Sequence, residues 1–108
     1  MPTYLIQVAY TAEGTAALLK NPQDRIKKVT PAIEKLGGKV IVGGFCFGDY
    51  DVMLVASLPN NVKAAAAAMA FGAGGAVKAV KTTHLLSSRE AVEAMKLGSQ
   101  TGYKPAKQ

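Results

Sequence analysis

The sequence contains one cysteine and no tryptophan in 108 residues. A single cysteine, Cys46, cannot form a disulfide within the chain, and it cannot supply the cysteine pairs of a structural zinc site. The chain also lacks any apolar run near the roughly 20 residues that a membrane-spanning helix needs. Its N-terminal segment, MPTYLIQVAY, has no basic region followed by a signal-peptide core. We therefore expect a soluble cytoplasmic protein that does not enter a membrane.

Acidic residues are scarce, since 13 lysines and arginines stand against 7 aspartates and glutamates and give a net charge of +6. Such a balance is compatible with a nucleic acid, an acidic membrane or a small anion as the partner. The basic residues form no single run, because they are spread over a helical stretch, a late strand and the C-terminal tail. We therefore expect no nucleic-acid partner and interpret the charge as a solvated surface.

The remaining sequence predicts one α+β domain. Alternating apolar side chains predict strands at residues 3–10, 39–47, 50–58 and 77–86. Helix formers and capping residues predict helices at residues 11–21, 22–36, 62–71 and, with a serine cap, 87–97. Pro22 is expected to separate the first two helices and Pro31 to kink or break the second, while Gly14 weakens the first. This order is that of a ferredoxin-like βαββαβ fold with a four-stranded antiparallel sheet and an extra C-terminal helix.

A hairpin is predicted between the two middle strands, with Gly48 and Asp49 alone reversing the chain. Gly48 accepts the positive φ of a tight turn, and Asp49 can hydrogen-bond to its own backbone. Asp51 is expected to begin the next strand, on the side of the sheet opposite Tyr50. Its carboxylate then needs a partner. The candidates are backbone amides, Lys81 and His84.

Four segments placed in this order resemble the GYD domain family over about residues 2–94. They are MPTY (1–4), KLGGK (35–39), GDYD (48–51) and KTTH (81–84). The resemblance implies a small stand-alone protein with a ferredoxin-like fold of the dimeric α+β barrel type, and it implies no particular activity. We expect residues 1–97 to form this domain. Residues 98–108 lie outside the resemblance and, being poor in apolar side chains, are expected to form a flexible tail.

The first strand is apolar on both sides. Tyr4, Ile6 and Val8 share one side with Tyr10, and Leu5 lies on the other together with Gln7 and Ala9. A sheet with helices on only one face normally has a more polar outer side. A second copy of the chain therefore provides the simplest cover, and we expect a homo-oligomer.

The candidate site residues are expected to line a small-molecule cleft between the sheet and a partner subunit. They are Tyr4, Cys46, Asp49, Tyr50, Asp51 and His84. His84, the only histidine, is the candidate catalytic residue, as a general base, a proton shuttle or an axial haem ligand. The alternative is a hydrogen-bonded strand residue. No metal site is expected, because one histidine and two aspartates lack further ligands at the right spacing.

Three classes of function remain open, and the sequence identifies no cofactor. The first is an oligomeric small-ligand-binding or assembly module. The second follows from the Gly-Asp-Tyr-Asp turn, which also resembles the amino-acid effector domain of leucine-responsive transcription regulators. This chain lacks the helix-turn-helix domain of those regulators, so direct control of DNA is not expected. The third is an enzyme of the dimeric α+β barrel type, cofactor-free or haem monooxygenase-like, that uses His84.

Overall fold

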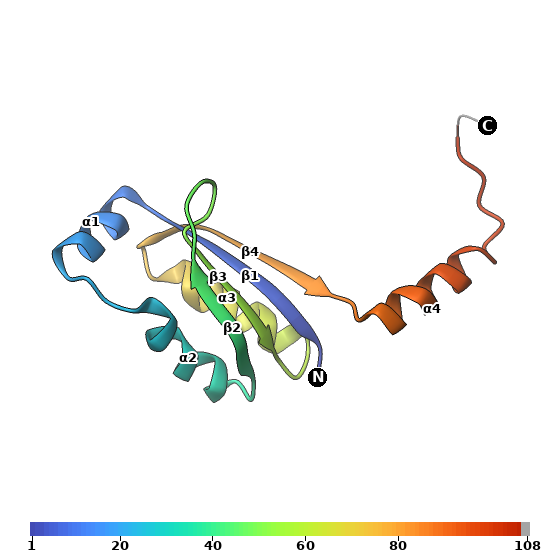
Figure 1. The fold of residues 1–108 in the computed structure, drawn as a ribbon, viewed down its shortest axis with the longest axis horizontal. Helices are drawn as coiled ribbons and strands as arrows, with labels where there is room; N and C mark the ends of the chain where they lie inside the picture. The colour runs from blue at the N-terminus through green and yellow to red at the C-terminus, as the bar shows by residue number, and fades with distance from the viewer. Residues whose placement is uncertain (107–108) are drawn as a thin grey trace.

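The computed structural model describes residues 1–106, so Lys107 and Gln108, part of the expected flexible tail, lie outside the described residues. The elements in chain order are β1 (Thr3–Tyr10), α1 (Ala12–Lys20), α2 (Arg25–Lys35), β2 (Lys39–Phe45), β3 (Val52–Ser57), α3 (Asn61–Ala73), β4 (Val77–Leu85) and α4 (Ser88–Gly98). The four strands form an antiparallel sheet in the order β2-β3-β1-β4. Figure 1 shows this sheet with α2 and α3 beside it. The predicted ferredoxin-like fold is confirmed, with two helices between β1 and β2.

The core lies on the face of the sheet that the helices cover. Tyr4, Ile6 and Val8 are buried there, as the alternation in β1 predicts. Ala64 and Ala67 of α3 are also buried in this cluster, because their small side chains let the helix approach closely. The opposite face, with Leu5 and Val55, stays partly exposed in the single chain.

The helix boundaries follow the capping residues. Helix α2 begins at Arg25 rather than at Pro22, because the Asp24 carboxylate accepts hydrogen bonds from two backbone amides of the first turn. Of the two effects predicted for Pro31, a kink or a break in the helix, the break does not occur. The helix continues to Lys35, with Ile33 fully buried in the core, so one lost backbone hydrogen bond does not end it. Within residues 1–106, no helix is both long and apolar enough to cross a membrane.

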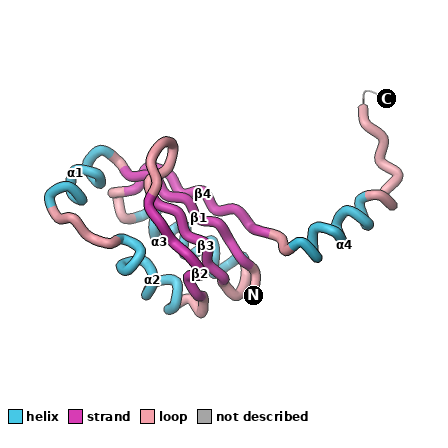
Figure 2. Tube along the Cα trace, viewed as in Figure 1, coloured by secondary structure: helices cyan, strands magenta, loops and turns pink. Residues whose placement is uncertain are grey.

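The hairpin differs from the prediction. Strand β2 ends at Phe45 and β3 begins at Val52, so residues 46–51 form a longer loop instead of a two-residue turn (Figure 2). Asp51 therefore precedes the strand. Its backbone N–H donates to the Val8 carbonyl at 2.8 Å, and its carbonyl accepts from the Cys46 N–H at 2.8 Å. These two bonds hold Asp51 against the end of β1, and residues 47–50 reverse the chain between them.

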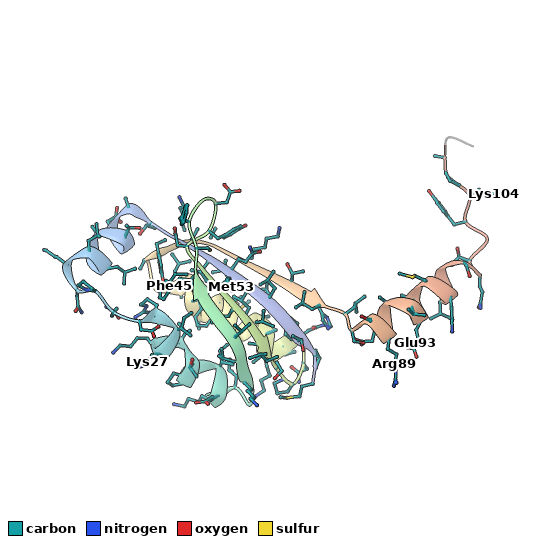
Figure 3. All side chains as sticks on the ribbon, in the orientation of Figure 1. Lys27, Phe45, Met53, Arg89, Glu93 and Lys104 are labelled. Carbon is teal, nitrogen blue, oxygen red and sulfur yellow. The ribbon has the colours of Figure 1, made fainter. Side chains whose placement is uncertain are left out.

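Helix α4 stands away from the sheet, at the opposite end from α1 (Figures 1 and 2). None of its 11 residues is buried, and the molecule is accordingly elongated, measuring 57 × 34 × 21 Å. Ser87 caps the helix as predicted, through reciprocal hydrogen bonds with Glu90. Arg89 and Glu93 project from it into solvent (Figure 3). We call residues 86–98 the arm.

Candidate functional site

The predicted site residues fall into two groups at opposite ends of β1. Tyr4 pairs with His84 across the β1–β4 ladder at one end. The second group comprises Cys46, Asp49, Tyr50 and Asp51. Asp51 binds the backbone of Tyr10, six residues further along β1 than Tyr4. At about 3.3 Å per residue the two groups are separated by roughly 20 Å. The single chain therefore does not bring the two groups into one cleft, and a cleft completed by a partner subunit stays a prediction.

Tyr4 and His84 form an aromatic pair near the start of α3. Their ring centroids are 4.8 Å apart and the rings are inclined by 34°. The buried Tyr4 uses its hydroxyl to donate a hydrogen bond to Asn61 Oδ1 at 2.7 Å, while His84 is exposed. Sequence reasoning missed Asn61, which the fold brings to Tyr4 from 57 residues away. Tyr4 thus ties α3 to the sheet, and His84 beside it is exposed to solvent.

Metal ligands do not gather around His84 or elsewhere in the described chain. No group of three or more histidine, cysteine or acidic side chains is arranged to hold a metal ion within residues 1–106. A surface depression of about 610 Å³ lies at the root of the arm, and His84, Leu86 and Glu90 are part of its lining.

Asp51 finds a backbone partner, one of the three predicted kinds. Its Oδ2 accepts a hydrogen bond from the Tyr10 N–H at 2.8 Å. The β1–β3 pairing ends at Val8 and Val52, so β3 provides no backbone partner for the Tyr10 amide, and the carboxylate of Asp51 takes that place. Lys81, by contrast, pairs with Gln7 in the ladder. Asp51 is thus a clasp between the hairpin and β1.

The tip of the hairpin carries exposed apolar side chains. Phe47 is 98% exposed and Phe45 is 56% exposed. The Cys46 thiol between them donates to the Tyr50 carbonyl at 3.2 Å and is also exposed. Asp49 is exposed in the turn, and Gly48 has the predicted positive φ, at 113°. We call Phe45 and Phe47 the hairpin tip.

A further cleft, which sequence reasoning missed, lies between α1, the start of α2 and the end of α3. Its volume is about 310 Å³, and Tyr10, Arg25 and Phe71 contribute to its walls. Burial raises the pKa of Tyr10 above its usual 10.0, although the nearby Arg25 acts in the opposite direction. The walls come from segments far apart in the chain that carry no motif, so no local signal reveals the cleft.

Most of the chain, residues 4–95, matches the family model of the GYD domain. A curated protein from Thermus thermophilus is also similar to this chain, with 32% identity over 79 residues, which cover 72% of this chain and 82% of that protein. It is named "Glutamine synthetase and cystathionine beta-lyase binding protein". The relative is thus named for binding two enzymes.

Proposed function

This chain belongs to the GYD domain family, and we propose that it is a homo-oligomeric module that binds a metabolic enzyme. The name of the Thermus thermophilus relative supports a protein partner of this kind. We infer that the partner of this chain is a glutamine synthetase and that the hairpin tip makes the contact.

The observation that carries the proposal is the placement of exposed apolar side chains. Most of the large ones lie either on β2 and its loop or on the arm and tail. They are Ile41, Val42, Phe45 and Phe47 in the first region, and Leu86, Val92, Met95, Leu97 and Tyr103 in the second. Contiguous exposed apolar side chains mark protein interaction surfaces, and aromatic residues and methionine are enriched at interface cores.

The two regions suit different partners. Helix α4 has 11 residues, and none of them is buried. An isolated helix shorter than about 12–15 residues is only marginally stable in water, so α4 needs a surface to pack against. We assign the arm to a second copy of the chain. In a two-fold dimer, the arm of each copy would pack into the depression at the root of the other copy's arm. The loop between β2 and β3, which carries Phe47, projects at the end of the sheet away from the arm (Figure 1). We therefore assign the hairpin tip to the enzyme.

The decisive experiment measures binding of the full chain to the glutamine synthetase of the same organism by biolayer interferometry. Phe47→Ser is expected to weaken binding by about ten-fold or more, because a buried aromatic anchor dominates such interfaces. Leu19→Ser is the matched control, since Leu19 is also an exposed apolar residue, 79% exposed, but lies on α1. It is expected to bind like the wild type.

Thermal unfolding of both variants checks that neither change disturbs the fold. Equal loss of affinity in the two variants, or wild-type affinity in Phe47→Ser, would remove the hairpin tip from the interface. A wild-type chain that does not bind the enzyme at all would overturn the assignment of the partner.

A further inference from the structure

The cleft between α1, α2 and α3 has the form of a small-molecule site. Its volume of about 310 Å³ is at the lower end of the roughly 300–1,000 Å³ typical of ligand pockets. A smaller cavity of about 60 Å³ lies against the sheet and shares Tyr10, Arg25, Phe71 and Val77 with it. The two spaces together lead from the surface toward the core.

The polar groups of the cleft are few and are held in place. Arg25 is half-buried, and its Nη1 donates a hydrogen bond to Gln23 Oε1 at 3.0 Å. The Gln23 Nε2 in turn donates to the Asn21 carbonyl at 3.2 Å. This second bond holds the Gln23 side chain in place, and Gln23 in turn orients the guanidinium of Arg25. The phenol of Tyr10 is partly buried beside Arg25. A guanidinium with further free N–H groups and a hydroxyl therefore border the same cleft.

The remaining walls are mainly apolar. Phe71 supplies an aromatic ring, and Val52 and Leu54 from the sheet lie at the inner cavity. Helix α1 is packed tightly against the α3–β4 connection, because the Thr11 N–H donates to the Ala76 carbonyl at 2.8 Å. This combination of apolar walls with a few fixed polar groups is that of preformed ligand pockets.

The positive charge of Arg25 in the cleft favours an anionic ligand. Arg25 is the only charged residue that lines either space within residues 1–106, and no carboxylate in that part of the chain forms an ion pair with it. The start of α2 offers no second anion site, because Asp24 already accepts hydrogen bonds from its first amides. One guanidinium balances one negative charge and pairs with a carboxylate through two parallel hydrogen bonds.

We propose that this cleft binds a small monocarboxylate with an aromatic or branched apolar body. The carboxylate pairs with Arg25 and accepts from the Tyr10 hydroxyl, and the apolar body lies against Phe71. The site is separate from the hairpin tip and from the arm, so ligand binding and enzyme binding are tested independently of each other.

The test is isothermal titration of the full chain with phenylacetate, 3-methylbutanoate, phenylacetamide and inorganic phosphate. We expect saturable binding of at least one of the two carboxylates. Phenylacetamide has the shape of phenylacetate without its charge, and phosphate has charge without an apolar body. Both are expected to bind at least about ten-fold more weakly, because the charged hydrogen bonds or the apolar contacts are missing.

Two variants locate the site. Arg25→Gln is expected to weaken carboxylate binding by about ten-fold or more, whereas Arg89→Gln, which removes an exposed arginine on the arm, leaves it unchanged. Amide chemical shifts in the wild type are expected to move at Arg25, Phe71 and Gly74, a readout that does not depend on how well a variant folds. Absence of carboxylate binding, shift changes confined to other residues, or wild-type affinity in a folded Arg25→Gln chain would overturn the proposal.

Discussion

Asp51 connects the hairpin to β1 through both its backbone and its side chain. The carboxylate of Asp51 accepts a hydrogen bond from the Tyr10 amide at 2.8 Å. Asp51→Asn keeps an acceptor oxygen but removes the charge, so it is expected to lower the free energy of unfolding by about 1 kcal/mol, the difference between a charged and a neutral hydrogen bond. Urea denaturation measures the difference. Asp49→Asn, an exposed change in the same loop, is the control and is expected to have little effect. Equal stability of the two variants would mean that the carboxylate is not a clasp.

Gly14 has a packing role that its sequence position conceals. A Cβ atom at Gly14 would lie 2.4 Å from the Ala76 carbonyl oxygen, which is backbone and cannot move aside easily. Gly14→Ala is therefore expected to destabilise the fold by about 1–3 kcal/mol, despite the better helix propensity of alanine. Gly72→Ala is the matched control, because Gly72 is also helical and has open space around it. If thermal unfolding shows that Gly14→Ala is as stable as Gly72→Ala or more stable, this packing role of Gly14 is contradicted.

At the scale of elements, the arm helix depends on its cap. Hydrogen bonds from the backbone and side chain of Ser87 hold the pKa of Glu90 below its usual 4.5. A lowered pKa in the folded state means that the cap stabilises the helix above about pH 4.5 and that this contribution is lost as the pH falls through the lowered pKa. We therefore expect the helical Cα chemical shifts of residues 88–94 to decrease on acidification.

The matched variants separate Glu90 from its neighbour. Glu90→Gln is expected to remove the pH dependence of the helical shifts, since glutamine does not titrate in this range. Glu93→Gln is expected to keep it, because Glu93 lies in the middle of α4 and outside the cap. If the pH dependence disappears in Glu93→Gln and persists in Glu90→Gln, then Glu93 is the titrating residue and the prediction for Glu90 is wrong.

At the scale of the whole molecule, the single chain exposes two apolar surfaces, namely part of the sheet face and the arm. A second copy of the chain would cover them. We expect an obligate homo-oligomer in sedimentation velocity and native mass spectrometry. Removing residues 88–108 is expected to lower the association state or to raise the concentration at which the oligomer dissociates. A wild-type chain that sediments as a monomer at every concentration would falsify this prediction.

Much of the fold was predictable because its signals are local. The alternation of Tyr4, Ile6 and Val8 gives the buried side of β1, and Ser87 with Glu90 gives the start of α4. The length of the hairpin loop was not predictable. It depends on hydrogen bonds from Asp51 to a strand more than 40 residues earlier, and a turn rule reads only adjacent residues. The candidate sites were less predictable still. The expected residues form two separate groups in the single chain, one around Tyr4 and His84 and one around Asp51.

The sequence by itself determined the order of strands and helices, the serine cap of α4 and the family, because periodicity, capping and turn chemistry act over a few residues. Only the tertiary structure decided that His84 and Asp51 lie at opposite ends of β1. It also decided that Arg25, Tyr10 and Phe71 border one cleft and that α4 stands apart from the body. These relations depend on strand register and on helix packing between distant segments, and neither is encoded in any short stretch of the chain.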